Sequence, residues 1–290
     1  MKILVIGSGF IGSSIIQRLQ SEGHEILIFS KTFKNVIRRQ QITGDIFNFE
    51  DFSKTLSWAP QVIIHTAWAT THGAYTDDSS NVQYAKFTCD LAKYVSQTEL
   101  EHLIILGSCA EYGHQILAST AGNTELKPIN LYAQQKVLAM NSAMNFLLDS
   151  KVRLTWARIF QPYGPHQDKK RLLPYLVDSL KKGKQVNLND TSSILDWVTT
   201  RDIASAISWI INHETPVEVD IGTTIGYTNV ELLRHLESLL GHHSNQWGRI
   251  AAQPSTGNAV TLVGKRSPLF VSGWLPSDNL DTGLKWVLDL

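Results

Sequence analysis

A tyrosine and a lysine stand four residues apart in the segment LYAQQK, at Tyr132 and Lys136. If this segment is helical, both side chains lie on one face of the helix, one turn apart. A free tyrosine has a pKa of about 10 and a free lysine about 10.4, so a nearby ammonium group favours the phenolate. The pair could be a proton donor tuned toward neutral pH, or part of an ordinary helix with an exposed lysine. The spacing alone leaves both interpretations open.

A glycine-rich turn near the N-terminus indicates a dinucleotide site. The hexapeptide GSGFIG follows an apolar run and opens a stretch with helical periodicity. The first glycine permits a tight turn, the second lets a pyrophosphate approach the backbone, and the third lets the helix pack close to the strand. The N–H groups at the start of the helix would bind the phosphates. The cofactor contacts expected in this turn are Gly7, Gly9, Phe10, Ile11 and Gly12.

The end of the second apolar run bears on which dinucleotide is bound. An acid there would hydrogen-bond the adenosine ribose and favour NAD. The chain has Ser30 and Lys31 instead, and a hydroxyl with a lysine suits a 2′-phosphate. The sequence therefore favours NADPH, with NAD as the alternative, although a Ser-Lys pair is also common in solvated loops.

Three further positions are expected to contact the cofactor. Asp45 could accept a hydrogen bond from the adenine amino group while Ile46 packs on the ring, although Gly-Asp is also an ordinary turn. Ala67 ends the apolar run QVIIHTA, where the strand should meet the cofactor. We therefore place these three residues with the glycine turn.

Strand-like and helix-like segments alternate along the first half of the chain. The strand-like runs are Lys2–Ile6, Glu25–Phe29, Gln61–Ala67, His102–Ser108 and Arg153–Phe160, and helical patterns cover Gly12–Glu22, Asn81–Ser96 and a stretch from about Asn130. This order predicts an α/β fold with a Rossmann-type doubly wound parallel sheet. Strands that are apolar throughout agree with a sheet covered on both faces.

The composition changes after Phe160, where QPYGPHQDKKR is rich in turn formers and charge. Helices are expected near Leu172–Lys182, Thr200–Ile211 and Asn229–Leu240, with strands at Gln185–Leu188 and Val217–Ile221. We predict a dinucleotide-binding domain over residues 1–165 and a smaller substrate-binding lobe over 166–290, with residues 194–222 folding back onto the first domain.

Charge and cysteine content exclude several classes of function. Lys+Arg and Asp+Glu are both 26, so no basic surface predicts binding to nucleic acid or to an anionic membrane. Cys89 and Cys109 are too few for a disulfide framework or a metal cluster, so we expect no metal. The apolar run at the N-terminus is too short to span a membrane and lacks a signal-peptide cleavage pattern, so we expect a cytoplasmic protein.

Several motifs in this order resemble those of the extended short-chain dehydrogenase/reductases. They are the glycine turn, GSCAEYG at residues 107–113, the Tyr132–Lys136 pair, ARIFQPYGP at residues 157–165, and the closing GWLPSDNLDTGL. Typical members of this family act on nucleotide-activated sugars. The resemblance places the catalytic serine at Ser108 and makes Tyr132 the acid for a carbonyl oxygen. It implies that Lys136 lowers the pKa of Tyr132 and holds the nicotinamide ribose.

Departures from the family pattern reduce the number of reactions that the chain is expected to catalyse. Related 4,6-dehydratases carry Asp-Glu directly after the catalytic serine or threonine, whereas this chain has Cys109 and Ala110. Dehydration is therefore not expected, and Cys109 is expected to be a small buried residue. The family's substrate-lobe arginine is replaced by Leu195, so the substrate pyrophosphate must be bound elsewhere. The candidates are Arg171, Arg201 and Arg266, with Gln161 in place of a family asparagine.

These residues together predict a reductase that transfers hydride from NADPH to a nucleoside-diphosphate 4-keto-6-deoxyhexose, with Tyr132 protonating the oxygen. One alternative is a 4-epimerase that keeps NAD bound, and another is a dinucleotide-sensing protein without catalysis. The resemblance also implies a homodimer formed through the helices at Asn81–Ser96 and Asn130–Leu147.

Overall fold

The computed structural model describes residues 1–290 except 33–39, 116, 189, 242–250, 253–258 and 266. Its largest sheet has seven strands in the order β10-β6-β5-β4-β1-β2-β3, and every neighbouring pair is parallel. The strands are β1 (Lys2–Ile6), β2 (Glu25–Ser30), β3 (Gln41–Thr43), β4 (Val62–His65), β5 (His102–Ser108), β6 (Arg153–Ile159) and β10 (Glu218–Ile221). The prediction of a doubly wound parallel sheet is confirmed.

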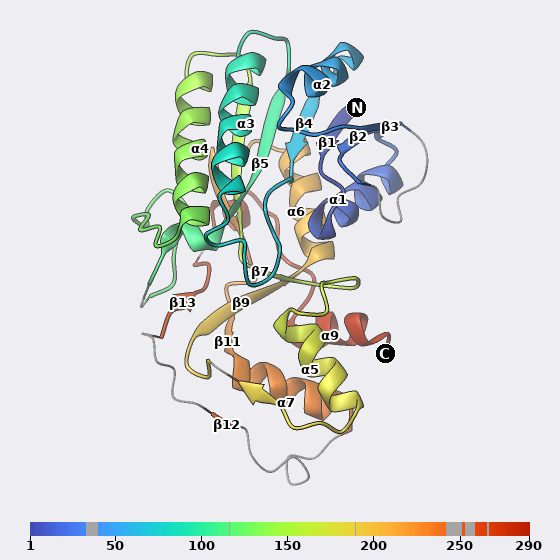
Figure 1. Ribbon diagram of the computed structural model, residues 1–290, viewed down its shortest axis with the longest axis vertical. Helices are drawn as coiled ribbons and strands as arrows, with labels where there is room; N and C mark the ends of the chain where they lie inside the picture. The colour runs from blue at the N-terminus through green and yellow to red at the C-terminus, as the bar shows by residue number, and fades with distance from the viewer. Residues whose placement is uncertain (33–39, 116, 189, 242–250, 253–258, 266) are drawn as a thin grey trace.

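Helices cover both faces of this sheet (Figure 1). On one face, α1 (Phe10–Ser21) packs beside α6 (Thr200–Asn212), and their apolar sides share a core with β1 and β2. On the other face lie α2 (Phe49–Ser53), α3 (Ser80–Val95) and α4 (Leu131–Leu147), and the last two run side by side. This covering explains why the strands carry apolar residues on both sides.

A smaller lobe lies at one end of the large sheet (Figure 1). At its centre β9 (Ile194–Thr199) pairs with β7 (Gln161–Tyr163), β11 (Gly226–Thr228) and β13 (Thr261–Leu262). The helices α5 (Leu172–Lys181), α7 (Asn229–Leu239) and α9 (Leu280–Leu288) share a separate apolar core. The remaining short elements are η1 (Lys54–Trp58), η2 (Cys109–Tyr112), β8 (Asn187–Leu188), β12 (Ala251–Ala252) and α8 (Pro268–Val271).

The segment after β9 returns to the large sheet, where α6 packs on α1 and β10 pairs with β6. β9 itself stays in the small sheet. The domain boundary at residue 165 stays a prediction. The strand expected over Gln185–Leu188 covers only Asn187–Leu188. No helix in the described part of the chain is long and apolar enough to cross a membrane.

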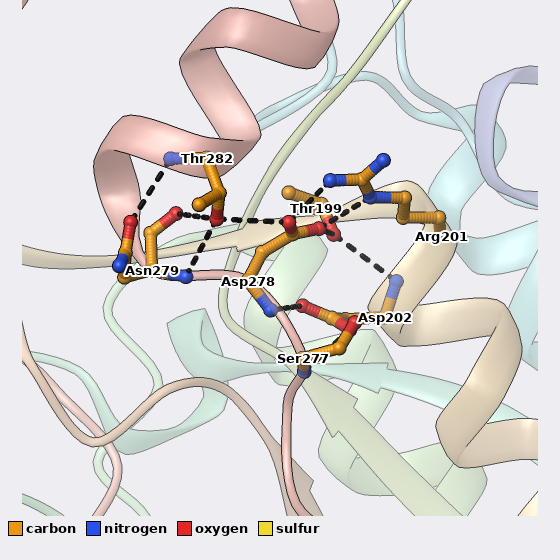
Figure 2. A network of polar contacts seen from close by, with 7 residues as sticks. All are labelled: Thr199, Arg201, Asp202, Ser277, Asp278, Asn279 and Thr282. Carbon is orange, nitrogen blue, oxygen red and sulfur yellow. Dashed lines mark hydrogen bonds and ion pairs between the residues drawn. The ribbon is translucent and has the colours of Figure 1, made fainter.

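A polar clamp joins the C-terminal motif to the junction of β9 and α6 (Figure 2). The carboxylate of Asp278 accepts hydrogen bonds from the Thr199 and Thr282 hydroxyls, each at 3.0 Å, and forms a two-pronged ion pair with the Arg201 guanidinium. The Arg201 guanidinium also lies 4.6 Å from the ring centroid of Trp286. Two-pronged pairing of this kind fixes the arginine in orientation as well as position.

A second carboxylate completes the clamp (Figure 2). Asp202 accepts hydrogen bonds from the backbone N–H and the hydroxyl of Ser277, at 2.9 and 2.6 Å, and from the backbone N–H of Asp278 at 3.1 Å. Asp202 therefore binds the first two residues of SDN through their N–H groups, while the Asp278 carboxylate binds Thr199 and Arg201 at the start of α6. The clamp holds α9 against the large-sheet half of the molecule.

Candidate active site

The predicted site residues gather at one edge of the large sheet. All seven strands are parallel, so their carboxyl ends share this edge, and Gly7, Ser30 and Ser108 lie at the ends of β1, β2 and β5. The strand order reverses between β1 and β4, which is the position where open α/β sheets form a ligand crevice. Ala67 follows β4 on the other side of that point and packs against the core.

The glycine turn leaves room on one side only. Gly7 has φ of +100°, a conformation that favours glycine. A Cβ on Gly12 would stand 2.2 Å from the Gly7 carbonyl oxygen, whereas a Cβ on Gly9 would meet no atom within 4 Å. Thr66 fixes the turn because its hydroxyl donates to the carbonyl oxygens of Ile6 and Gly7, both at 3.0 Å. The open side at Gly9, beside the first turn of α1, fits a pyrophosphate.

The two glycines make a matched pair of variants. Gly9→Ala should fold normally, because Gly9 has φ of −71° and open space, yet weaken dinucleotide binding by roughly tenfold or more. Gly12→Ala should instead lower the free energy of unfolding by about 1–3 kcal/mol through overpacking. Urea melts and calorimetric titration with NAD separate the two effects. Equal losses of stability, or unchanged affinity in Gly9→Ala, would contradict the assignment of this turn.

The expected adenosine end of the site is already paired within the protein. The Lys31 ammonium lies 2.9 Å from the Asp45 carboxylate, and that hydrogen bond lowers the pKa of Asp45. The hydroxyl of Ser30 donates to the carbonyl oxygen of Thr32 at 2.9 Å. Ile46 is buried on the core beneath. Lys31 is therefore not a free cation, which weakens its fit to a 2′-phosphate.

The three predicted catalytic residues are brought together. Asn130 caps α4 by accepting a hydrogen bond from the N–H of Ala133 at 2.9 Å, which starts the helix just before Tyr132. The side chain of Ser108 lies near enough to the Tyr132 hydroxyl to lower its pKa, against the larger effect of burial. Lys136, one turn along the same face, is 4% exposed. The interpretation of LYAQQK as an ordinary helix with an exposed lysine is therefore wrong.

Lys136 lies in a mostly neutral surrounding. Its ammonium donates to the carbonyl oxygen of Leu106 at 2.6 Å and stands 3.8 Å from the ring centroid of Trp68. Burial lowers the pKa of Lys136 to about 7, opposed by the charge of Glu111. Burial raises the pKa of Tyr132, opposed by the hydrogen bond from Ser108. Burial thus shifts the pKa of each group toward its neutral form.

Among the candidate arginines, Arg171 is connected to Tyr132 through the ring of Tyr75. It stands at the start of α5, donates to the carbonyl oxygen of Thr70 at 3.1 Å, and lies 5.2 Å from the ring centroid of Tyr75. The Tyr75 ring meets the Tyr132 ring edge to face at 5.0 Å. Arg201 is held in the clamp with Asp278, which already supplies its counter-charge.

The remaining predicted site residues lie in different parts of the molecule. Gln161 lies in β7, in register with Trp197 of β9. Phe10 and Ile11 form the first turn of α1 at the dinucleotide crevice. Arg266 lies outside the described residues. Cys109 is buried, and its thiol pKa is raised by burial, so it is a core residue, as expected.

Sequence reasoning missed one carboxylate beside the site. Glu111 lies in GSCAEYG and is fully buried, and its side chain accepts a hydrogen bond from the Ser108 backbone N–H at 2.7 Å. The sequence pattern that could have identified Glu111 is its position three residues after Ser108, which is the spacing of a capping box. In the described part of the chain, no group of three or more His, Cys, Asp or Glu side chains could hold a metal.

Comparison with known proteins places this site in a family. The model of the NAD dependent epimerase/dehydratase family matches residues 3–222. The chain belongs to this family. The expected resemblance to extended short-chain dehydrogenase/reductases is thereby confirmed, and the glycine turn, Ser108, Tyr132 and Lys136 all fall inside the matched range.

Individual relatives of this family member are distant in sequence and close in fold. A UDP-glucose 4-epimerase of Lactobacillus helveticus is 21% identical over 278 residues, covering 83% of this chain and 82% of that protein. The structure of a UDP-glucose 4-epimerase from Thermotoga maritima with UDP-glucose has a TM-score of 0.86 at 20% identity, covering 100% and 98% of the two chains. A dTDP-glucose 4,6-dehydratase from Bacillus anthracis in complex with NAD has a TM-score of 0.83 at 23% identity, covering 100% and 96%.

Proposed function

We propose that the protein is a nucleotide-sugar 4-epimerase that retains NAD. The observation that carries this proposal is the grouping of Ser108, Tyr132 and Lys136 at the same edge of the sheet as an open glycine turn. Similarity to a UDP-glucose 4-epimerase supports the choice of reaction. A 4,6-dehydration is not proposed because Cys109 and Ala110 occupy the positions that would need an acid and a base.

The residues of the chain have separable tasks in this reaction. The glycine turn and the start of α1 would hold a nicotinamide dinucleotide, which would supply reversible hydride transfer at the sugar carbon. As a phenolate, Tyr132 takes the proton from the sugar hydroxyl, and as the resulting phenol it later gives the proton back, while Ser108 hydrogen-bonds the same sugar oxygen. Lys136, when protonated, favours the phenolate of Tyr132 because an opposite charge stabilises it. Arg171 is the proposed partner of the substrate pyrophosphate.

The ion pair between Lys31 and Asp45 supports NAD over NADPH as the resident cofactor. Asp45 competes with a 2′-phosphate for the same ammonium, so the parent protein should bind NAD at least as tightly as NADPH. Asp45→Asn should free Lys31 and raise NADPH affinity several-fold. Asp51→Asn is the matched control, because it releases Lys54 from a similar exposed pair. A parent protein that strongly prefers NADPH would contradict this proposal.

A reductase that uses NADPH on a 4-keto-6-deoxyhexose nucleotide is the second candidate. The end of β2 favours this candidate. Ser30 stands there in place of the acid that would bind the ribose hydroxyls of NAD. A third candidate, a dinucleotide-sensing protein without catalysis, would need none of the catalytic grouping.

One experiment separates these candidates. The purified protein is incubated with UDP-hexoses without added cofactor, and separately with 4-keto-6-deoxyhexose nucleotides and NADPH. Interconversion of the 4-epimers in the first assay supports the epimerase. NADPH consumption in the second assay alone supports the reductase, and binding without turnover in either supports the sensor.

We also propose a two-fold dimer formed through α3 and α4. Both helices expose large apolar side chains: Val82 is 50% exposed, Tyr94 44%, Leu138 48% and Phe146 41%. An apolar surface of this kind is characteristic of an association site. Leu138→Glu should give a monomer by light scattering, whereas Leu275→Glu, at an exposed residue near the C-terminus, should leave the dimer intact. A monomeric parent protein at micromolar concentration would contradict this.

A further inference from the structure

The carboxylate of Glu111 is built into the backbone that carries Ser108. Ser108 caps η2, where its hydroxyl accepts a hydrogen bond from the N–H of Ala110 at 3.2 Å. In return, the Ser108 N–H donates to Glu111 Oε1 at 2.7 Å. A Cβ on Gly107 would stand 2.8 Å from the same carboxylate oxygen. The residue that ends β5 and carries the catalytic hydroxyl is therefore fixed in place by a buried acid.

Every hydrogen-bond partner of Glu111 is a donor. Besides Ser108, the Trp156 indole N–H lies 3.0 Å from Oε2, and Arg158 Nε lies 2.7 Å from the same oxygen. A protonated carboxyl group would place its own O–H against one of these donors. Burial raises the pKa of Glu111, but this donor set stabilises the carboxylate. We take Glu111 as ionised.

The charges around Glu111 do not cancel. Arg158 neutralises Glu111 only in part, because the same guanidinium also pairs at 2.7 Å with Glu218, a less buried carboxylate. Lys136 has no carboxylate of its own in the described structure; its near contacts are the carbonyl of Leu106 and aromatic rings. The Trp156 indole lies between the two groups, because its N–H donates to Glu111 Oε2 at 3.0 Å and its ring centroid stands 5.9 Å from the Lys136 ammonium.

We propose that Glu111 is a positioning residue that fixes Ser108 and serves as the counter-charge keeping Lys136 protonated. The inference rests on the proposed function only in taking Lys136 and Ser108 as members of the active site. The titratable groups facing Lys136 are Glu111 from η2, His65 from β4 and Tyr132 from its own helix. His65 is buried and neutral, with a pKa lowered to about 3, so Glu111 is the anion among them.

The charge of Glu111 can be removed with little change of shape. Glu111→Gln keeps an acceptor for the Ser108 N–H but turns an amide N–H toward Arg158 and Trp156. Glu111→Asp keeps the charge and shortens the reach to Ser108. Glu218→Gln is the matched control, because it removes the other carboxylate on Arg158 without touching Ser108.

The test follows the protonation of Lys136 directly and needs no substrate. Protein labelled with ¹³C at lysine Cε is titrated by NMR, and the Lys136 resonance is assigned by its loss in Lys136→Met. We expect Glu111→Gln to lower the Lys136 midpoint by about one pH unit or more, and Glu111→Asp to keep it near the parent value. Glu218→Gln should shift it by less than half as much.

The outcomes decide the inference independently of the reaction. An unchanged midpoint in Glu111→Gln, or an equal shift in Glu218→Gln, would overturn the counter-charge role even if the enzyme proves to be an epimerase. If Glu111→Gln does not fold, Glu111→Asp decides the inference. A parent-like Lys136 midpoint in this variant, together with reduced kcat at unchanged KM, supports the inference. A Lys136 midpoint lowered by about one pH unit, although the charge is kept, overturns it. A failed epimerase assay leaves the titration result valid.

Discussion

Replacement of Tyr132 by phenylalanine is expected to lower kcat about 10²- to 10⁴-fold, the usual contribution of a positioned acid or base. The variant keeps the ring that packs edge to face against Tyr75 and loses only the hydroxyl that faces Ser108. Folding and NAD affinity should therefore stay close to the parent values. Steady-state kinetics with a UDP-hexose and a thermal melt measure both properties.

Tyr75→Phe is the matched control for this prediction. It removes a neighbouring hydroxyl while the stacked ring beneath Arg171 remains, so its kcat should change little. Near-parent turnover in Tyr132→Phe, or an equal loss in Tyr75→Phe, would show that the phenol of Tyr132 is not the group that moves the proton.

Lys136→Met is expected to abolish most turnover and yet to stabilise the nucleotide-free protein near neutral pH. The parent buries an ammonium whose pKa is lowered to about 7, and a methionine of similar length needs no charge in that place. We expect the free energy of unfolding to rise by roughly 1–2 kcal/mol at pH 6–7, because active-site residues commonly reduce stability in favour of activity. Urea melts of both proteins measure it.

The pH dependence of this gain has a definite sign. Unfolded lysine has a pKa of about 10.4, so between about pH 7 and pH 10 the unfolded parent binds more protons than the folded one. The stability of the parent relative to the variant therefore rises with pH in that window. The advantage of Lys136→Met should be largest below pH 7 and fade toward pH 10. An advantage that is constant from pH 6 to pH 9.5 would mean that Lys136 keeps an ordinary pKa.

Local sequence patterns were sufficient to predict the sheet and to place Tyr132 and Lys136 on one face of a helix. The run of apolar strands follows from burial on both faces, and the glycine turn follows from a contact between Gly12 and Gly7 only five positions earlier. Tyr132 and Lys136 are one helical turn apart, so their common face needs no tertiary information. Each of these features depends on neighbours in sequence or on a strict order of elements.

Features that depend on long-range pairing could not be read from the sequence. Arg201 looked like a free substrate-binding cation until Asp278, 77 residues away, was found beside it. Lys31 is paired with Asp45, 14 residues away and beyond β3. No role was predicted for Glu111, because its burial as a carboxylate depends on the ion pair with Arg158, 47 residues further along the chain. In each case the partner's charge decides what the residue can bind.

The most direct test of the account uses a UDP-hexose carrying deuterium at C4. The account predicts that the parent protein, with NAD, converts it to the 4-epimer with the deuterium retained, because hydride leaves and returns without entering water. Tyr132→Phe should form little of this product. Mass spectrometry and NMR of the product decide the question. Loss of the deuterium to solvent, or formation of the epimer by Tyr132→Phe at the parent rate, would contradict hydride transfer at this site.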